Sequence, residues 1–243
     1  MREIDYAASL MFALSFRTSF AHIQCGNYTA ASAQADELVA LADKKGASEW
    51  KADGMLLQGH LLALTGKASE AVQMMTSGIT ALRSTGATLW MPSHLSRLAR
   101  AHADLGQFDD AWRCIDEAMT AVETTKERWC EAEINRIAGE IALLSPQPDA
   151  ARAEACFERA LVVARKQQAK SWELRAAISM ARLWRDQGKW QQARELLAPV
   201  YGWFTEGFDT RDLKDAKALL DELASWDVGG RGQAGIERGS TGH

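Results

Sequence analysis

The stretch LWMPSHLSRLARAHADLGQFDDAWRCIDEAM, residues 89–119, decides the fold. It begins near a tryptophan, continues with apolar residues three or four positions apart, breaks at Leu105-Gly106, and then resumes the same spacing up to Met119. Apolar residues at that spacing are typical of amphipathic helices, and glycine is the preferred residue just past the end of a helix. The stretch therefore predicts two antiparallel helices joined by a short turn.

Imperfect copies of this stretch follow one another along the chain. Four tryptophans mark them, spaced by 40, 39 and 43 residues: Trp50, Trp90, Trp129 and Trp172. A glycine stands 16 residues after three of them, at Gly66, Gly106 and Gly188, whereas the fourth copy has Ser145-Pro146-Gln147-Pro148 at that place. The first copy has Leu10 instead of the tryptophan, and its Gly26 lies 40 residues before Gly66. A fixed period of this length indicates a solenoid of helical repeats.

The period divides the chain into one repeat domain, residues 1–226, and a tail. Its five hairpins are expected near 8–47, 48–87, 88–126, 127–169 and 170–205. A capping helix over 210–224 is predicted, because Thr210 is a favourable N-cap and LKDAKALLDEL after it has one polar face. The glycine-rich end of the chain has no periodicity, which predicts disorder over 227–243. Since the apolar residues nowhere alternate as in strands, the fold class is all-α.

Small residues recur at fixed places in the copies. Nine residues after the tryptophans stand Gly59, Ala99, Ala138 and Ala181, and a second small position holds Gly78, Ala118 and Ala160. Together with the alanines at 71 and 111, this pattern resembles the tetratricopeptide repeat (TPR), although each unit here is longer than the plain repeat. The resemblance implies a right-handed superhelical solenoid of about five hairpins plus the capping helix, with a concave groove lined by the first helix of each hairpin.

A second resemblance covers nearly the whole chain and is most specific in its last 100 residues. ERWCEAEINRIAGEIALL (127–144), EACFERALVVARKQQAKSWELRAAISMARLWRDQG (154–188) and LLAPVYGWFTEGFDTRDLKDAKALLDEL (196–223) are similar to the C-terminal repeats of large bacterial proteins. Those proteins carry a nucleotide-cyclase or winged-helix domain and an AAA-type ATPase module. This sequence has no P-loop motif, so that chemistry has no counterpart in it. Because the sequence lacks those catalytic modules, it could be a detached remnant of such a protein, a split subunit or a stand-alone scaffold.

Composition excludes several classes of function. The net charge of −4 gives no general attraction for nucleic acid or an anionic membrane, and no apolar run reaches the ~20 residues that span a bilayer. The four cysteines form no C-x-x-C pair, and Cys114 and Cys156 share a repeat position on an apolar helix face, which predicts small buried side chains. With no signal-peptide pattern at the N-terminus, we expect a cytoplasmic protein without metal or cofactor.

The groove positions of the TPR, carried over by register, give the candidate binding residues. Those selected are His60, Arg100, Asn135, Arg175, Arg182 and Arg185. The last unit places three arginines on this face, and arginine binds carboxylates and phosphates through two parallel hydrogen bonds. The alternative is that these arginines pair with Glu173, Asp186 or Glu195 and bind nothing. No histidine has a partner at a spacing typical of catalysis, so we predict no catalytic residue.

These observations predict a non-catalytic protein-interaction or ligand-sensing scaffold in bacterial signalling, with a protein or peptide partner. The alternative is a regulatory module that acts in trans on an ATPase or nucleotide cyclase. An enzyme in its own right and a non-functional remnant are further readings. Because the first unit begins with an uncovered apolar face, we also expect a homodimer through the N-terminal unit or a partner that covers this face.

Overall fold

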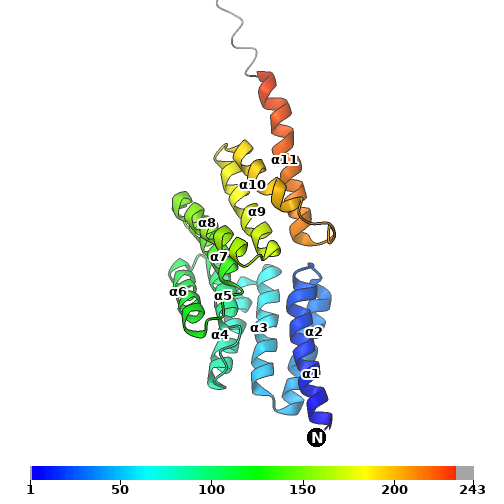
Figure 1. Ribbon diagram of the computed structural model, residues 1–243. Helices are drawn as coiled ribbons and strands as arrows, with labels where there is room; N and C mark the ends of the chain where they lie inside the picture. The colour runs from blue at the N-terminus through cyan, green and yellow to red at the C-terminus, as the bar shows by residue number, and fades with distance from the viewer. Residues whose placement is uncertain (1, 234–243) are drawn as a thin grey trace, which may run out of the picture.

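The chain is an all-α TPR-like solenoid, as the repeats predict (Figure 1). The computed structural model describes residues 2–233, without the side chains of residues 2–5, 19, 20 and 226–233. The helices are, in chain order, α1 (Arg2–Phe16), the π-helix η1 (Arg17–Ile23), α2 (Tyr28–Lys45), α3 (Ser48–Leu64), α4 (Ala68–Ser84), α5 (Met91–Asp104), α6 (Phe108–Thr125), α7 (Glu131–Leu144), α8 (Ala150–Lys166), α9 (Lys170–Asp186), α10 (Trp190–Tyr201) and α11 (Arg211–Gln233).

Consecutive helices pack as antiparallel pairs, and the pairs stack on one another. Helix α3 packs on α4, α5 on α6, α7 on α8 and α9 on α10, while α1 and η1 together form the first partner of α2. The first helices also contact each other in order, α3 with α5, α5 with α7 and α7 with α9. The stack curves so that α11 approaches the tip of α2 (Figure 1). The first helices therefore form a continuous inner wall.

Glycine ends the first helix in three hairpins, as the sequence predicts. Gly66, Gly106 and Gly188 have φ of 83°, 73° and 77°, a left-handed conformation that strains other residues. In the fourth hairpin the helix ends instead at Ser145, whose extended backbone leads into the proline-containing loop. Asp149 then caps α8, because its side chain accepts a hydrogen bond from the backbone N–H of Arg152 at 2.8 Å.

The recurring small positions allow the two helices of a hairpin to approach closely. A Cβ atom added at Gly59 of α3 would lie 2.4 Å from Cγ of Met75 on α4, and one at Gly78 of α4 would lie 2.8 Å from Cγ of Leu56 on α3. Since both distances are far shorter than a van der Waals contact, any larger side chain would push the pair apart. The small residues are therefore a requirement of packing.

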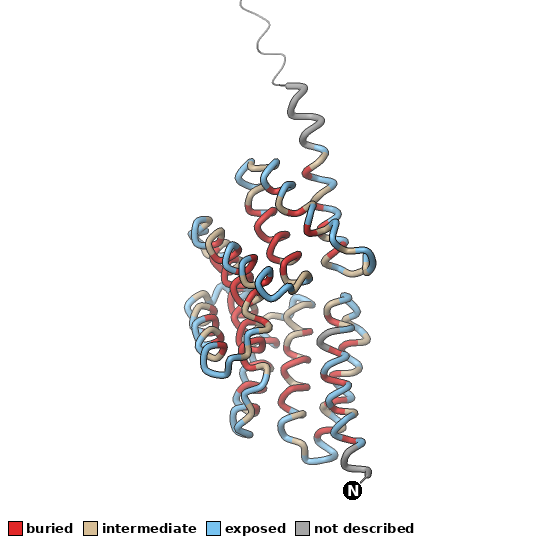
Figure 2. Tube along the Cα trace, viewed as in Figure 1, coloured by how far each residue is buried: buried red, intermediate tan, exposed pale blue. Residues whose placement is uncertain are grey.

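The buried residues lie between the two layers of helices and continue along the whole stack (Figure 2). The cysteines at 114 and 156 are both buried in this core, which confirms the prediction for them. Within the described residues, no helix is long and apolar enough to cross a membrane.

Helix α11 packs on α9 and α10 through Leu213, Ala216 and Leu219. It continues to Gln233, so residues 227–233 are helical where the sequence predicts disorder. The physical reason is that extending an existing helix gains one hydrogen bond for each residue fixed, even where glycine disfavours it. The rest of the predicted tail, 234–243, lies outside the described residues.

Two of the four marker tryptophans precede their helix instead of belonging to it. Trp90 has φ 62°, and its backbone N–H donates to the Glu127 carboxylate at 2.9 Å. The Trp129 indole N–H donates to the same carboxylate at 2.7 Å. This glutamate therefore ties the start of the third unit to the start of the fourth.

Candidate ligand-binding cavity

The concave side of the solenoid encloses a cavity of about 410 Å³. The first helices of the hairpins supply most of its lining. The rest comes from the residues just before α7, from the loop before α2 with the first residue of α2, and from the start of α11. Its polar and aromatic lining residues are Gln24, Tyr28, His60, Ser93, Ser96, Arg97, Arg100, Asp104, Trp129, Glu133, Arg136, Glu140, Trp172, Arg175, Ser179, Arg182, Arg211, Asp212 and Asp215. A cavity of this size is typical of small-molecule sites.

Four of the six residues predicted from the TPR register line this cavity: His60, Arg100, Arg175 and Arg182. Asn135 does not line it, because its side chain is buried and its Nδ2 donates to the Glu131 carbonyl oxygen at 2.8 Å. Arg185 does not line it either. Its guanidinium forms ion pairs with Asp186 at 2.8 Å and with Glu222 of α11 at 3.0 Å.

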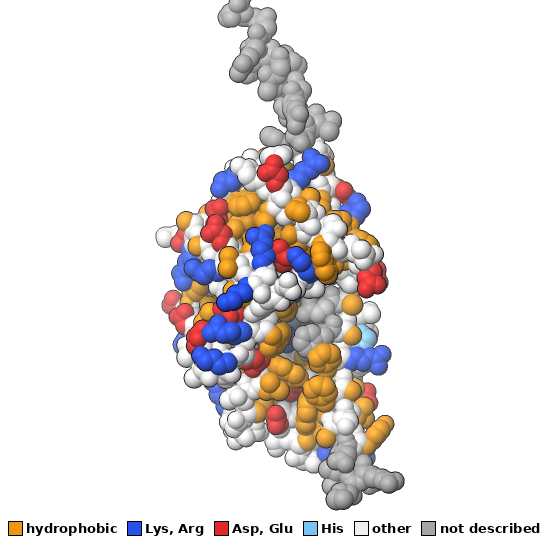
Figure 3. All heavy atoms as spheres, in the orientation of Figure 1, with side chains coloured by type: hydrophobic (Ala, Val, Ile, Leu, Met, Phe, Trp, Pro, Cys, Tyr) orange, Lys and Arg blue, Asp and Glu red, His pale blue; other side chains and the backbone are white. Residues whose placement is uncertain are grey.

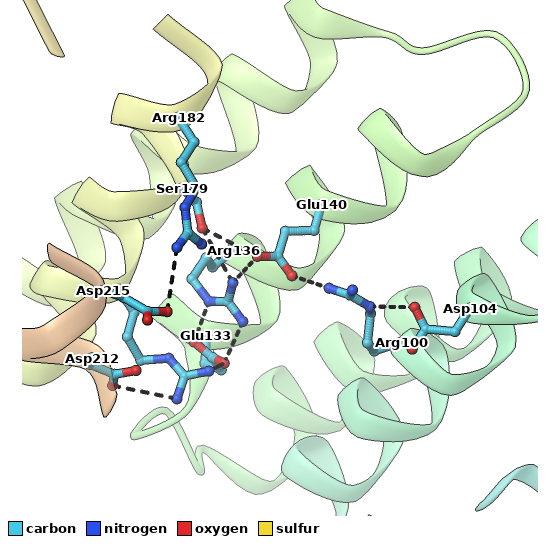
Figure 4. A network of polar contacts seen from close by, with 10 residues as sticks. Arg100, Asp104, Glu133, Arg136, Glu140, Ser179, Arg182, Asp212 and Asp215 are labelled. Carbon is cyan, nitrogen blue, oxygen red and sulfur yellow. Dashed lines mark hydrogen bonds and ion pairs between the residues drawn. The ribbon is translucent and has the colours of Figure 1, made fainter. Parts of the chain in front are cut away.

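Most of the lining arginines are held in one ion-pair network, which consists of Arg100, Asp104, Glu133, Arg136, Glu140, Arg175, Ser179, Arg182, Asp212 and Asp215 (Figure 4). Arg136 lies at its centre. Its Nε and Nη2 donate to the two oxygens of Glu133, each at 2.8 Å, and its Nη1 donates to Glu140. Glu140 also binds Arg100 on α5. The network therefore joins α5 to α7.

The same network reaches α9 and α11. Arg175 pairs with Glu133 at 2.7 Å and with Asp212 at 3.8 Å, and Arg182 pairs with Asp215 at 3.4 Å. The arginines of the last unit are thus already paired. Their partners come from other helices, apart from the predicted pair of Arg185 with Asp186.

Burial and ion pairing act in opposite directions on these groups. Burial lowers the pKa of Arg136, but Glu133 and Glu140 outweigh it and raise the pKa overall. Burial raises the pKa of Glu133, but Arg136 and Arg175 outweigh it and lower that pKa. Both side chains therefore stay charged. Residues 131–140, EAEINRIAGE, form part of the cavity wall, and Arg136 at its centre is only 9% exposed.

A second group of polar side chains is buried beneath the floor of the cavity, between α3 and α5. Asp53 is 4% exposed, and its Oδ1 lies 3.6 Å from Nε2 of His94. Neither carboxylate oxygen of Asp53 and neither ring nitrogen of His94 has a hydrogen-bond partner in the described part of the chain. Burial raises the pKa of Asp53 to about 6 and lowers that of His94 to about 3, because both charged forms lose their hydration. Burial likewise lowers the pKa of His60.

Arg97 of α5 is one of the lining residues that the TPR register misses. Among residues 2–233 it has no hydrogen bond or ion pair closer than 4 Å, and burial lowers its pKa. The spacing of polar residues in the sequence nevertheless places Arg97 on the same helical face as the predicted groove residues. Ser93, Arg97, Arg100 and Asp104 are three or four residues apart, so they share one face of α5.

The two ends of the solenoid meet across the cavity. Nη1 of Arg175 donates to Oε1 of Gln24 at 3.1 Å, and Nη1 of Arg211 donates to the Tyr28 hydroxyl at 2.7 Å. Trp129 and Trp172 line the wall nearby, with ring centroids 6.3 Å apart. In the described residues, no group of histidine, cysteine, aspartate or glutamate side chains is arranged to hold a metal ion.

Comparison with solved structures gives the fold. The chain is similar to two crystal structures of a Podosopora anserina putative kinesin light chain with nearly identical TPR-like repeats. The TM-scores are 0.52 and 0.54, each at 18% identity, and the alignments cover 80% and 83% of this chain and 93% and 96% of the other. No family model and no curated protein matches the sequence.

Proposed function

We propose that the chain is a non-catalytic scaffold for protein interaction and ligand sensing, with the concave cavity as its ligand site. The observation that carries the proposal is the lining itself. Every first helix from α3 to α9 contributes polar side chains to one space of about 410 Å³. A ligand there contacts all these helices at once, so it favours one curvature of the array over others. A protein partner that recognises that curvature would then bind the array more tightly when the ligand is present.

The TPR-like fold supports the interaction role, because stacked repeats offer long surfaces for a protein or peptide partner. Placement in bacterial signalling rests on the resemblance of residues 127–223 alone. An action in trans on an ATPase or nucleotide cyclase also rests on that resemblance alone, because the structural comparison found TPR-like repeat proteins and gives only the fold. Its test is whether the purified chain changes the turnover of an ATPase or cyclase that co-purifies with it.

Site-specific photo-crosslinking tests the scaffold role. A photoreactive amino acid placed at Ile178, inside the cavity, is expected to capture a ligand or partner in host lysate. The matched control carries the photoreactive amino acid at position 162 instead. Val162 is 64% exposed on α8 and does not line the cavity. Equal capture from both positions would contradict the use of the cavity.

The uncovered face of the first hairpin supports a homodimer through the N-terminal unit. On α1, Tyr6 is 72% exposed and Phe12 is 50% exposed. Hydrophobic side chains gather over this end of the molecule, whereas charged ones gather over α7 and α8 (Figure 3). We expect the Phe12→Asp substitution to shift the mass measured by light scattering from dimer to monomer. A monomeric wild type would contradict the dimer without affecting the cavity.

A further inference from the structure

Arg97 differs from the other arginines of the cavity in having nothing to bind. Arg100, Arg136, Arg175 and Arg182 each pair with at least one carboxylate. Arg211 donates to the Tyr28 hydroxyl. The guanidinium of Arg97 also lines the cavity, but it has no such contact within residues 2–233. Its donors are therefore available to a ligand.

The charges of the lining leave one cation in excess. Six arginines and five acidic residues line the cavity. Each of the five acids, Asp104, Glu133, Glu140, Asp212 and Asp215, is paired with an arginine of the ion-pair network. Asp53 acts on Arg97 from beneath the floor, but it lies beyond ion-pair distance and does not line the cavity. Arg97 and Arg211 are thus the two lining arginines without a carboxylate partner. Arg211 donates to the Tyr28 hydroxyl, so Arg97 is left with no ion pair or hydrogen bond among the described residues.

Apolar and aromatic side chains line the same cavity as this cation. Trp129 and Ile137 of the fourth unit and Trp172 and Ile178 of the fifth line the same space. The ends of the solenoid meet across it through Gln24 and Tyr28, which limits the length of an occupant. The site therefore favours a compact molecule that joins an anion to an apolar body.

From this geometry we propose that the cavity binds a small organic acid, whose carboxylate is held by Arg97 and whose aromatic or aliphatic body packs against Trp129 and Trp172. This inference rests on the proposed ligand-sensing function and specifies its ligand class. A carboxylate fits the planar fork of one guanidinium through two hydrogen bonds. It also matches a single excess charge better than a phosphate dianion does.

Calorimetric titration with benzoate tests the site, with benzamide as the neutral probe of the same shape and phenyl phosphate as the dianion. We expect benzoate to bind the wild type. Benzamide should bind at least about tenfold more weakly than benzoate, because a hydrogen bond to a charged group is lost. The Arg97→Met variant should lose about tenfold or more of the benzoate affinity for the same reason. Arg97→Lys keeps the charge without the fork, so its affinity should fall between the two.

The matched control is Arg113→Met. Arg113 of α6 does not line the cavity and pairs with Asp110 at the surface, so its loss should leave benzoate affinity unchanged. Equal losses in the two variants would overturn the role of Arg97. Absence of benzoate binding at millimolar concentration, or equal binding of benzamide, would overturn the carboxylate site. Thermal unfolding of each variant checks that it is folded.

One further outcome separates this proposal from the scaffold proposal, and two others would overturn the class of ligand. Benzoate binding that fails while crosslinking from Ile178 succeeds would remove the acid site and leave the scaffold. A peptide with a free C-terminal carboxylate that binds more tightly than benzoate, and depends on Arg97, would overturn the small acid as occupant. Tighter binding of phenyl phosphate than of benzoate would overturn the choice of a monoanion.

Discussion

The two sides of the cavity treat buried charge in opposite ways. On the side formed by α7, α9 and α11, every acid is matched by an arginine within 4 Å, as in the pairs of Arg136 with Glu133 and of Arg182 with Asp215. On the side formed by α3 and the first half of α5, the carboxylate of Asp53 and the ring of His94 have no hydrogen-bond partner among the described residues. Arg97 follows His94 on α5, and no ion pair joins it to the described part of the chain. The paired side is a structural wall. On the unpaired side, the buried polar groups lack hydrogen-bond partners from the protein itself. Unsatisfied polar groups cost stability, and they are retained where function needs them.

The largest expected effect comes from breaking the paired side. Arg136→Met should lower the free energy of unfolding by about 3 kcal/mol, because it leaves Glu133 and Glu140 buried with one arginine fewer. Urea titration followed by circular dichroism measures this loss. The control is Arg113→Met on α6, where an exposed pair with Asp110 is expected to contribute less than about 0.5 kcal/mol. Equal losses would mean that the wall adds no more than a surface ion pair.

The next effect has the opposite sign and belongs to the unpaired side. Asp53→Asn should raise the free energy of unfolding at pH 8 by about 2–3 kcal/mol, because a buried carboxylate with a pKa of about 6 folds at a cost. In the wild type the folded chain holds this proton more tightly than the unfolded chain. The penalty is therefore complete above pH 6 and disappears below the ordinary aspartate pKa of 3.8.

The matching measurement is urea unfolding of both proteins at pH 8 and at acidic pH. Ser15, Glu49, Arg97 and the neighbouring His94 surround position 53 in both proteins, and His94, with its pKa of about 3, stays neutral in the folded state over this range. Their own titrations therefore largely cancel in the difference. An advantage of Asp53→Asn that persists unchanged in acid would show that the charge of Asp53 is not its cause. Asp43→Asn, at an exposed pair with Lys51, is the neutral control.

A smaller effect on stability is expected for Arg97→Met, even though this substitution weakens acid binding about tenfold or more in our proposal. The side chain gives up no hydrogen bond or ion pair within the described residues, so the free energy of unfolding should change by less than about 1 kcal/mol. Differential scanning calorimetry without ligand measures it. A loss as large as that for Arg136→Met would place Arg97 in the structural wall and end the contrast between the two sides.

The smallest effect concerns the contact that joins the two sides. Tyr28→Phe removes only the hydroxyl that accepts from Arg211, at an exposed site, and should cost about 0.5 kcal/mol or less. Thermal unfolding compared with Tyr6→Phe, whose exposed hydroxyl has no such partner among the described residues, isolates the contact. A much larger loss of stability would show that the contact between the two ends of the solenoid stabilises the whole array.

The sequence predicted the fold in detail but the site only in part. The spacing of Trp50, Gly66 and Ala71 and of their copies determined the hairpins, because each unit must repeat the same local packing. The TPR register found Arg100, Arg175 and Arg182 but passed over Arg97, which lies on the same helical face. Asp212, Asp215 and Tyr28 could not be predicted at the cavity, since their position depends on the summed small rotations between units.

The hydrogen bonds from Arg175 to Gln24 and from Arg211 to Tyr28 join residues 151 and 183 positions apart in the chain. In an open solenoid each end frays independently, because a repeat contacts only its neighbours. Here one hydrogen bond joins the start of α11 to the start of α2 and another joins α9 to the loop before α2, so fraying at one end is coupled to the other. Amide hydrogen exchange in α2 and in the first turns of α11 should then slow together when the cavity is filled. The ends of the chain would thus report on an event at its centre.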